Sequence, residues 1–116
     1  MEVFLHHIYE YKKGLRNLVL HTMPASKRTM AEQKLKQQGI SFTIMEVNRA
    51  KINVFFGAGP CIEVVKSFGH KPLNMFTPEE DFILGTMLGY DRLQQCNRYI
   101  QRKEATVYNE VSIRVA

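Results

Sequence analysis

Phe55-Phe56-Gly57-Ala58-Gly59-Pro60-Cys61 is the stretch that decides the fold of this 116-residue chain. The phenylalanines end an apolar run, the two glycines predict a tight turn, and proline is typical of a first helical position. The stretch therefore predicts a buried strand that passes directly into a helix. Such a junction gathers backbone N–H groups at the positive end of a helix, where anions bind.

The candidate anion-binding residues are accordingly Gly57, Ala58, Gly59 and Cys61. The alternative is a purely structural turn that needs the backbone freedom of glycine. The spaced glycines of a dinucleotide site are absent, and Pro60 removes one donor. We therefore predict no cofactor here.

Neither cysteine has partners for a reactive site. A helix start lowers a thiol pKa, so a reactive Cys61 is one hypothesis, but no resolving cysteine or neighbouring histidine accompanies it. Cys96 falls among apolar residues and is expected in the core. The spacing of the histidines fits no metal site, so none is predicted.

Alternating apolar residues predict the strands. Residues 40–45 and 51–56 flank a short polar turn and predict a hairpin. Residues 15–20 predict a further strand. The tail, residues 106–115, also alternates, which favours a fourth strand or an extended arm on a partner surface.

Helical spacing and stop signals predict about five helices, at residues 2–13, 26–38, 60–67, 77–88 and 91–103. The clearest start is Thr77-Pro78-Glu79-Glu80, a capping box, which explains its acidic residues without catalysis. Together the elements predict one α+β domain over residues 1–116. Its small mixed sheet has three strands, or four with the tail.

The helix at 77–88 is apolar around most of its circumference, which is typical of a core or a subunit interface. This helix and the alternating tail favour a symmetric dimer. In the last helix Leu93, Cys96, Tyr99 and Ile100 are expected to face inward, and the arginines outward.

Sixteen basic residues against eleven acidic ones give a net charge of +5. The excess favours an acidic partner, and the candidate partner-binding residues are Lys27, Arg28, Lys34, Arg98 and Arg102. Nucleic acid is an alternative partner, although aromatic residues that would stack bases are not evident. Two cysteines and no long apolar run favour a cytoplasmic protein without a membrane segment.

Residues 55–59 and Ile83-Leu84-Gly85-Thr86-Met87-Leu88-Gly89-Tyr90-Asp91 resemble a small bacterial family known only as a domain of unknown function. The resemblance covers the whole chain and implies three strands, five helices and a homodimer. It brings no established activity. It also associates the chain with flavodoxins, small acidic electron carriers, as a partner.

Taken together, these observations predict a non-catalytic homodimeric interaction or accessory protein. A small anionic-ligand binder or enzyme built on the Gly57–Cys61 turn is one alternative. A nucleic-acid-binding protein is the other.

Overall fold

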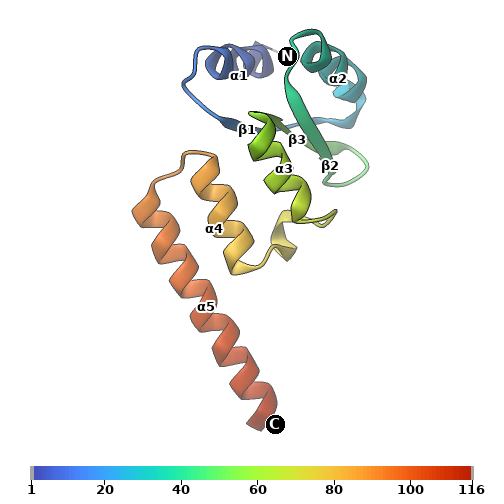
Figure 1. Cartoon of the computed structure of the whole chain (residues 1–116). Coiled ribbons are helices and arrows are strands. Elements are labelled where there is room, and N and C mark those ends of the chain that lie inside the picture. The colour runs from blue at the N-terminus through green and yellow to red at the C-terminus, as the bar shows by residue number, and fades with distance from the viewer. Residues whose placement is uncertain (1, 116) are drawn as a thin grey trace.

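The chain folds around a three-stranded sheet with helices on both faces (Figure 1). The computed structural model describes residues 2–115, with side chains through residue 106. In order, the elements are α1 (Glu2–Lys12), β1 (Leu18–Pro24), η1 (Ala25–Lys27), α2 (Arg28–Gln37), β2 (Ser41–Glu46), β3 (Lys51–Gly57), α3 (Gly59–Ser67), η2 (Leu73–Met75), α4 (Pro78–Met87) and α5 (Arg92–Val115). The predicted α+β class, with three strands and five α-helices, is confirmed across these residues.

The sheet has the strand order β1-β3-β2, and both ladders are antiparallel. The predicted hairpin of β2 and β3 is present, and Asn48 Oδ1 accepts bonds from the N–H groups of Ala50 and Lys51 at 2.8 and 2.9 Å. The expectation of a mixed sheet is wrong. Strands β1 and β2 do run in the same direction, but β3 lies between them and pairs with each in the opposite direction.

Two apolar cores lie on opposite faces of the sheet. On one face, α1 and α2 pack on Val54 and Phe56 of β3 through buried residues such as Phe4 and Leu35. On the other face, α3 and α4 pack around Phe55. Because β3 is central and covered on both sides, every residue after its first is buried.

The first strand begins later than the sequence predicts because α1 ends in a hydrogen-bonded turn. Gly14, at φ +79°, donates to the Tyr11 carbonyl, and Leu15 N–H donates to the Glu10 carbonyl, each at 3.0 Å. This is the Schellman ending of a helix. Leu15 therefore belongs to the helix end, and β1 starts at Leu18.

The predicted start of α4 is confirmed. Thr77 Oγ1 accepts the Glu80 N–H at 3.1 Å, and Glu80 Oε1 accepts the Thr77 N–H at 2.9 Å. This reciprocal capping satisfies two backbone donors that a helix start otherwise leaves open.

The tail is helical, so the expectation of a fourth strand at residues 106–115 is wrong. Helix α5 continues without a break to Val115 and projects beyond the sheet and the helices that cover it (Figure 1). Its sequence contains neither glycine nor proline. Once a helix has formed, each further residue adds a hydrogen bond without a new nucleation cost, which outweighs a weak alternation. Within the described part of the chain, no helix combines the length and apolar character needed to cross a membrane.

Candidate functional site

The glycine turn is fixed by a close backbone approach. Gly57 has φ +150°, and a Cβ at this position would lie 2.2 Å from the carbonyl oxygen of Asn17. The next N–H, of Ala58, donates to that same oxygen at 2.9 Å. One of the four candidate anion-binding residues therefore already uses its donor in joining β3 to the start of β1.

The other residues of this turn differ in their surroundings. Gly59 begins α3, and a Cβ there would have Ser41 Oγ as its nearest contact, at 3.8 Å. Cys61 is half-buried and packs against the core around Phe55. The structure thus keeps Gly57 to Cys61 together at one helix start, beside the first residue of β2.

The candidate basic residues around α2 are spread along it: Lys27 ends η1, Arg28 begins the helix and Lys34 lies in its last turn. Lys27 and Arg28 are exposed, and Lys34 is half-buried. Arg28 Nε contacts Glu32 Oε1 at 3.0 Å, one helical turn away. Arg28 also lines a cavity beside β2, so this end of α2 faces the sheet edge.

Arg98 and Arg102 of α5 bind to other groups of the same chain. Arg98 donates twice to Asp81 in α4, with nitrogen–oxygen distances of 2.7 and 3.1 Å. These bonds raise the pKa of Arg98 above its ordinary value, chiefly through the hydrogen bonds to Asp81. Arg102 donates to the carbonyl oxygen of Phe76 at 2.8 Å and lies 3.4 Å from Asp81. Both arginines therefore hold α5 against α4.

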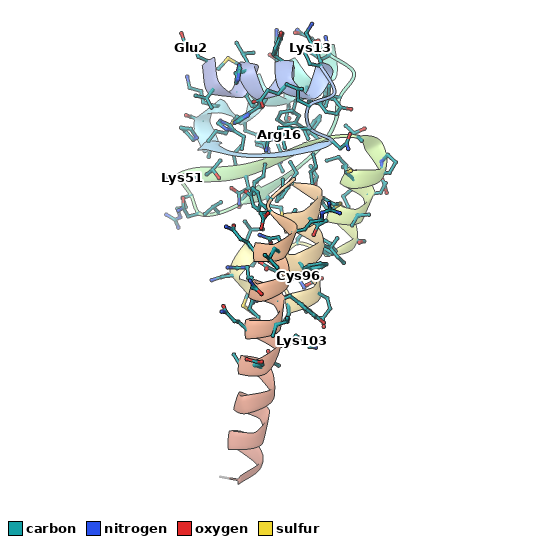
Figure 2. The ribbon with its side chains drawn as sticks, turned by 90° about the vertical axis from the view of Figure 1, so that its left-hand side faces the viewer. Glu2, Lys13, Arg16, Lys51, Cys96 and Lys103 are labelled. Carbon is teal, nitrogen blue, oxygen red and sulfur yellow. The ribbon has the colours of Figure 1, made fainter. Side chains whose placement is uncertain are left out.

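This contact reverses the expected faces of α5. Leu93 and Ile100 are 70% and 52% exposed, and Cys96 is exposed as well, whereas Tyr99 lies against Phe82 with ring centroids 5.6 Å apart. The prediction that Leu93, Cys96 and Ile100 face inward is wrong. Figure 2 looks onto α5, with Cys96 and Lys103 labelled along it.

The acidic first turn of α4 is the cause of the reversal. Glu79 contacts Lys103 at 2.9 Å, and Asp81 contacts Arg98. The hydrogen bond from Lys103 is the main cause of the lowered pKa of Glu79, and the one from Lys71 does the same for Glu80. Helices α4 and α5 run antiparallel, so the carboxylates of Glu79 and Asp81 meet the middle of α5. The carboxylates were expected to serve the helix start alone, and their pairing was missed.

Because Arg98, Arg102 and Lys103 satisfy the carboxylates, an apolar stripe remains outside, formed by Leu93, Cys96 and Ile100. This α5 stripe follows the three- and four-residue spacing of one helix face. In the sequence, Val107 and Val111 continue that spacing. Leu93 is the most exposed of the large apolar side chains that the structure describes.

The outer edge of β2 is a second candidate surface, which sequence reasoning missed. Ala25 and Ala58 donate to the Ala50 and Asn17 carbonyls, at the two ends of the β1–β3 ladder. Since bonded pairs alternate along antiparallel strands, the even residues of β3 bond to β1 and the odd ones to β2. The even residues of β2, Phe42, Ile44 and Glu46, therefore point their backbone N–H and C=O groups outward.

Two of the histidines lie against each other. His7 and His21 lie with ring centroids 5.3 Å apart, beside Phe4. Burial lowers the pKa of His21, and the nearby His7 lowers it further. Within residues 2–106, no three His, Cys, Asp or Glu side chains are grouped so as to hold a metal ion.

Comparison with known proteins places this arrangement in a family. The model of the family described as "Protein of unknown function (DUF2023)" matches residues 2–102. The chain belongs to DUF2023. The match covers the sheet, its helices and the first turns of α5 up to Arg102, so the α4–α5 contact of this DUF2023 protein lies within it. No curated protein matches the chain.

Proposed function

We propose that this protein is a non-catalytic homodimeric interaction or accessory protein of the cytoplasm, which binds an acidic protein partner. The observation that carries the dimer is the α5 stripe, where Leu93 is 70% and Ile100 is 52% exposed. Large apolar side chains set in a row on one helix are costly to leave in water and are typical of an interface.

The length of α5 supports the same proposal. Its 24 residues extend over about 36 Å, whereas the 10 residues of α4 cover about 15 Å of that length. Lys103, which contacts Glu79, is its last residue with a described contact to α4. Helical segments of fewer than about 12–15 residues are marginal in water unless something packs against them. A second copy of α5 provides that packing.

The magnitudes favour an interface larger than two side chains. Burial of the exposed parts of Leu93 and Ile100 in both copies contributes roughly 4–7 kcal/mol, at about 1.5–3 kcal/mol for a whole side chain. Association costs about 4–15 kcal/mol. We therefore expect the dimer to use α5 beyond Ile100, including Val107 and Val111.

Light scattering at micromolar concentration tests the dimer. The wild-type protein is expected at the dimer mass, and Leu93→Glu with Ile100→Glu at the monomer mass with an unchanged circular dichroism spectrum. Val3→Glu is the matched control, because Val3 is 61% exposed and lies on α1, which covers the other face of the sheet from α4. A monomeric wild-type protein contradicts the dimer proposal.

The acidic partner rests on the net charge of +5 and on Lys27, Arg28 and Lys34. A flavodoxin is one candidate of this class. Charge-steered binding weakens as salt rises. Titration with a flavodoxin at low and moderate salt should show this, and reversal of the three charges should slow association. Equal binding by the wild-type protein and the charge-reversed variant contradicts this docking site. Nucleic acid is titrated in the same way, as the competing ligand.

A further inference from the structure

The edge strand β2 carries hydrogen-bonding groups that the fold does not use. Within residues 2–115, no hydrogen bond reaches the outward N–H or C=O groups of Phe42, Ile44 and Glu46. Edge strands are commonly protected by proline, lysine or a bulge. The sequence of β2, Ser-Phe-Thr-Ile-Met-Glu, contains neither proline nor lysine, and its register with β3 runs without a bulge.

The opposite edge of the sheet is less suited to pairing. There the outward positions are the even residues of β1, and the last of them is Pro24, which has no N–H. Leu20 of β1 also lines a cavity that α4 and α5 enclose. A further strand therefore finds more donors on β2 than on β1.

A cavity of about 380 Å³ lies along the second half of β2. Three consecutive strand residues line it, namely Ile44, Met45 and Glu46. Ile44 belongs to the core under α1 and α2, and Met45 belongs to the core under α3 and α4. A cavity lined by both faces and by consecutive residues must follow the edge of the strand, where the backbone is accessible.

Two cations and one carboxylate line this cavity. The cations are Arg28 from α2 and Lys71, and the carboxylate is Glu46 of the strand. Arg28 also contacts Glu32, and Lys71 also contacts Glu80. Each of these carboxylates partly offsets the attraction of its cation for a ligand. With the net charge of +5, the balance favours a negatively charged segment.

We propose that the outer edge of β2 binds an extended, acidic segment of a partner protein as a fourth strand of the sheet. The inference rests on the acidic partner proposed above and names how that partner docks. Backbone bonds to Phe42, Ile44 and Glu46 supply the pairing, and acidic side chains face Arg28 and Lys71. This is strand addition, in which the backbone provides affinity and flanking side chains provide selectivity.

The first test uses a six-residue synthetic peptide, matched to the length of β2, that alternates valine with glutamate and is blocked at both ends. We expect its addition to protect the amides of Phe42, Ile44 and Glu46 from hydrogen exchange. The same peptide with alternate amides N-methylated should bind about tenfold more weakly or worse, because each lost bond counts. A lysine version should also bind more weakly.

Variants of the protein test the edge directly. Glu46→Pro removes one outward donor without removing a bond to β3, so the fold should remain and the peptide should bind more weakly. Thr22→Pro, at an outward position of β1, is the matched control. It also removes the bond from Thr22 Oγ1 to Asn53 at 2.6 Å, so its fold is checked by circular dichroism, and it should bind the peptide as the wild type does. Arg28→Glu should weaken binding, and Glu46→Gln should strengthen it.

Four outcomes overturn the inference. One is the absence of peptide binding at millimolar concentration, and another is equal binding of the N-methylated peptide. The third is protection of the β2 amides that rises with protein concentration alone, which assigns this edge to a second copy of the chain. If a flavodoxin binds the wild type and Glu46→Pro equally and in a salt-dependent manner, strand addition fails while the proposed acidic partner stands.

Discussion

Arg98 of α5 donates two hydrogen bonds to the carboxylate of Asp81 in the first turn of α4, at 2.7 and 3.1 Å. Two parallel N–H···O bonds fix an angle as well as a distance. This pair therefore sets the rotation of α5 about its own axis, and the apolar stripe is a consequence of that rotation.

The strength of this pair is the first prediction. Arg98→Ala should lower the free energy of unfolding by about 1 kcal/mol or less, because the pair is at the surface. Arg98→Lys should not restore it, since lysine cannot form both bonds. Urea denaturation of the single variants and of Arg98→Ala with Asp81→Ala gives the coupling. A double variant whose loss equals the sum of the single losses contradicts a direct interaction.

Gly57→Ala should destabilise the fold by at least about 2 kcal/mol, because it adds both an unfavourable φ and a clash with the backbone of Asn17. Gly59→Ala is the matched control and should be close to neutral, since the nearest contact of its Cβ lies at 3.8 Å. Thermal melts of both variants check this. Similar melting temperatures for the two variants show that the close backbone approach at Gly57 does not affect the stability of the fold.

Thr77→Ala should cost about 1 kcal/mol, through loss of the cap on the Glu80 N–H. Thr86→Ala, an exposed site near the other end of α4, is the comparison and should change stability little. Chemical denaturation measures both. An equal loss at Thr86 argues that the effect comes from the general loss of a threonine side chain and not from the cap, because alanine has the higher helix propensity.

Stability should fall as the pH drops below about 6.5, the ordinary pKa of histidine, toward the lowered pKa of His21. Burial and the nearby His7 lower that pKa, so the unfolded chain binds the proton more readily and the proton favours unfolding. Above about pH 6.5 the stabilisation that comes from the lowered pKa of His21 is fully present. Melting temperatures between pH 5 and 8 should therefore vary less in His21→Phe than in the wild type, whereas exposed His70→Asn should retain the wild-type slope.

Cys96 should react with a thiol reagent in the native state, because it is exposed on α5, and Cys61 should react more slowly. Counting modified thiols over time in Cys61→Ala and Cys96→Ala measures each rate. Slow labelling of Cys96 in a dilute monomer contradicts the exposed stripe. If the dimer forms through α5, the rate at Cys96 should fall as protein concentration rises.

Much of the fold could be predicted from local signals. The turn at Gly57, the capping box at Thr77 and the hairpin around Asn48 each depend on a few neighbouring residues. The strand order could not be predicted in this way, because it depends on which strand has two apolar faces. Phe55 and Phe56 side by side were the available signal, since they indicate burial on both faces.

The rotation of α5 escaped prediction for a different reason. Counting apolar residues placed Leu93 and Ile100 inside, but it ignored the three carboxylates at the start of the preceding helix. In this antiparallel pair of helices Asp81 meets Arg98 and Arg102, which are four residues apart on one face, and Glu79 meets Lys103. Charges on two neighbouring helices, considered together, were the signal that could have predicted the rotation.

The position of β3 between two earlier strands has a consequence for how the chain acquires its structure. As the chain emerges from the ribosome, β1 and β2 appear first and have no strand to pair with, because each bonds only to β3. Neither ladder can form until Lys51–Gly57 emerges. By then α2 lies between β1 and β2 in the chain. Folding should thus wait for one short segment, and a nascent chain that stops before it exposes two unpaired strands to aggregation.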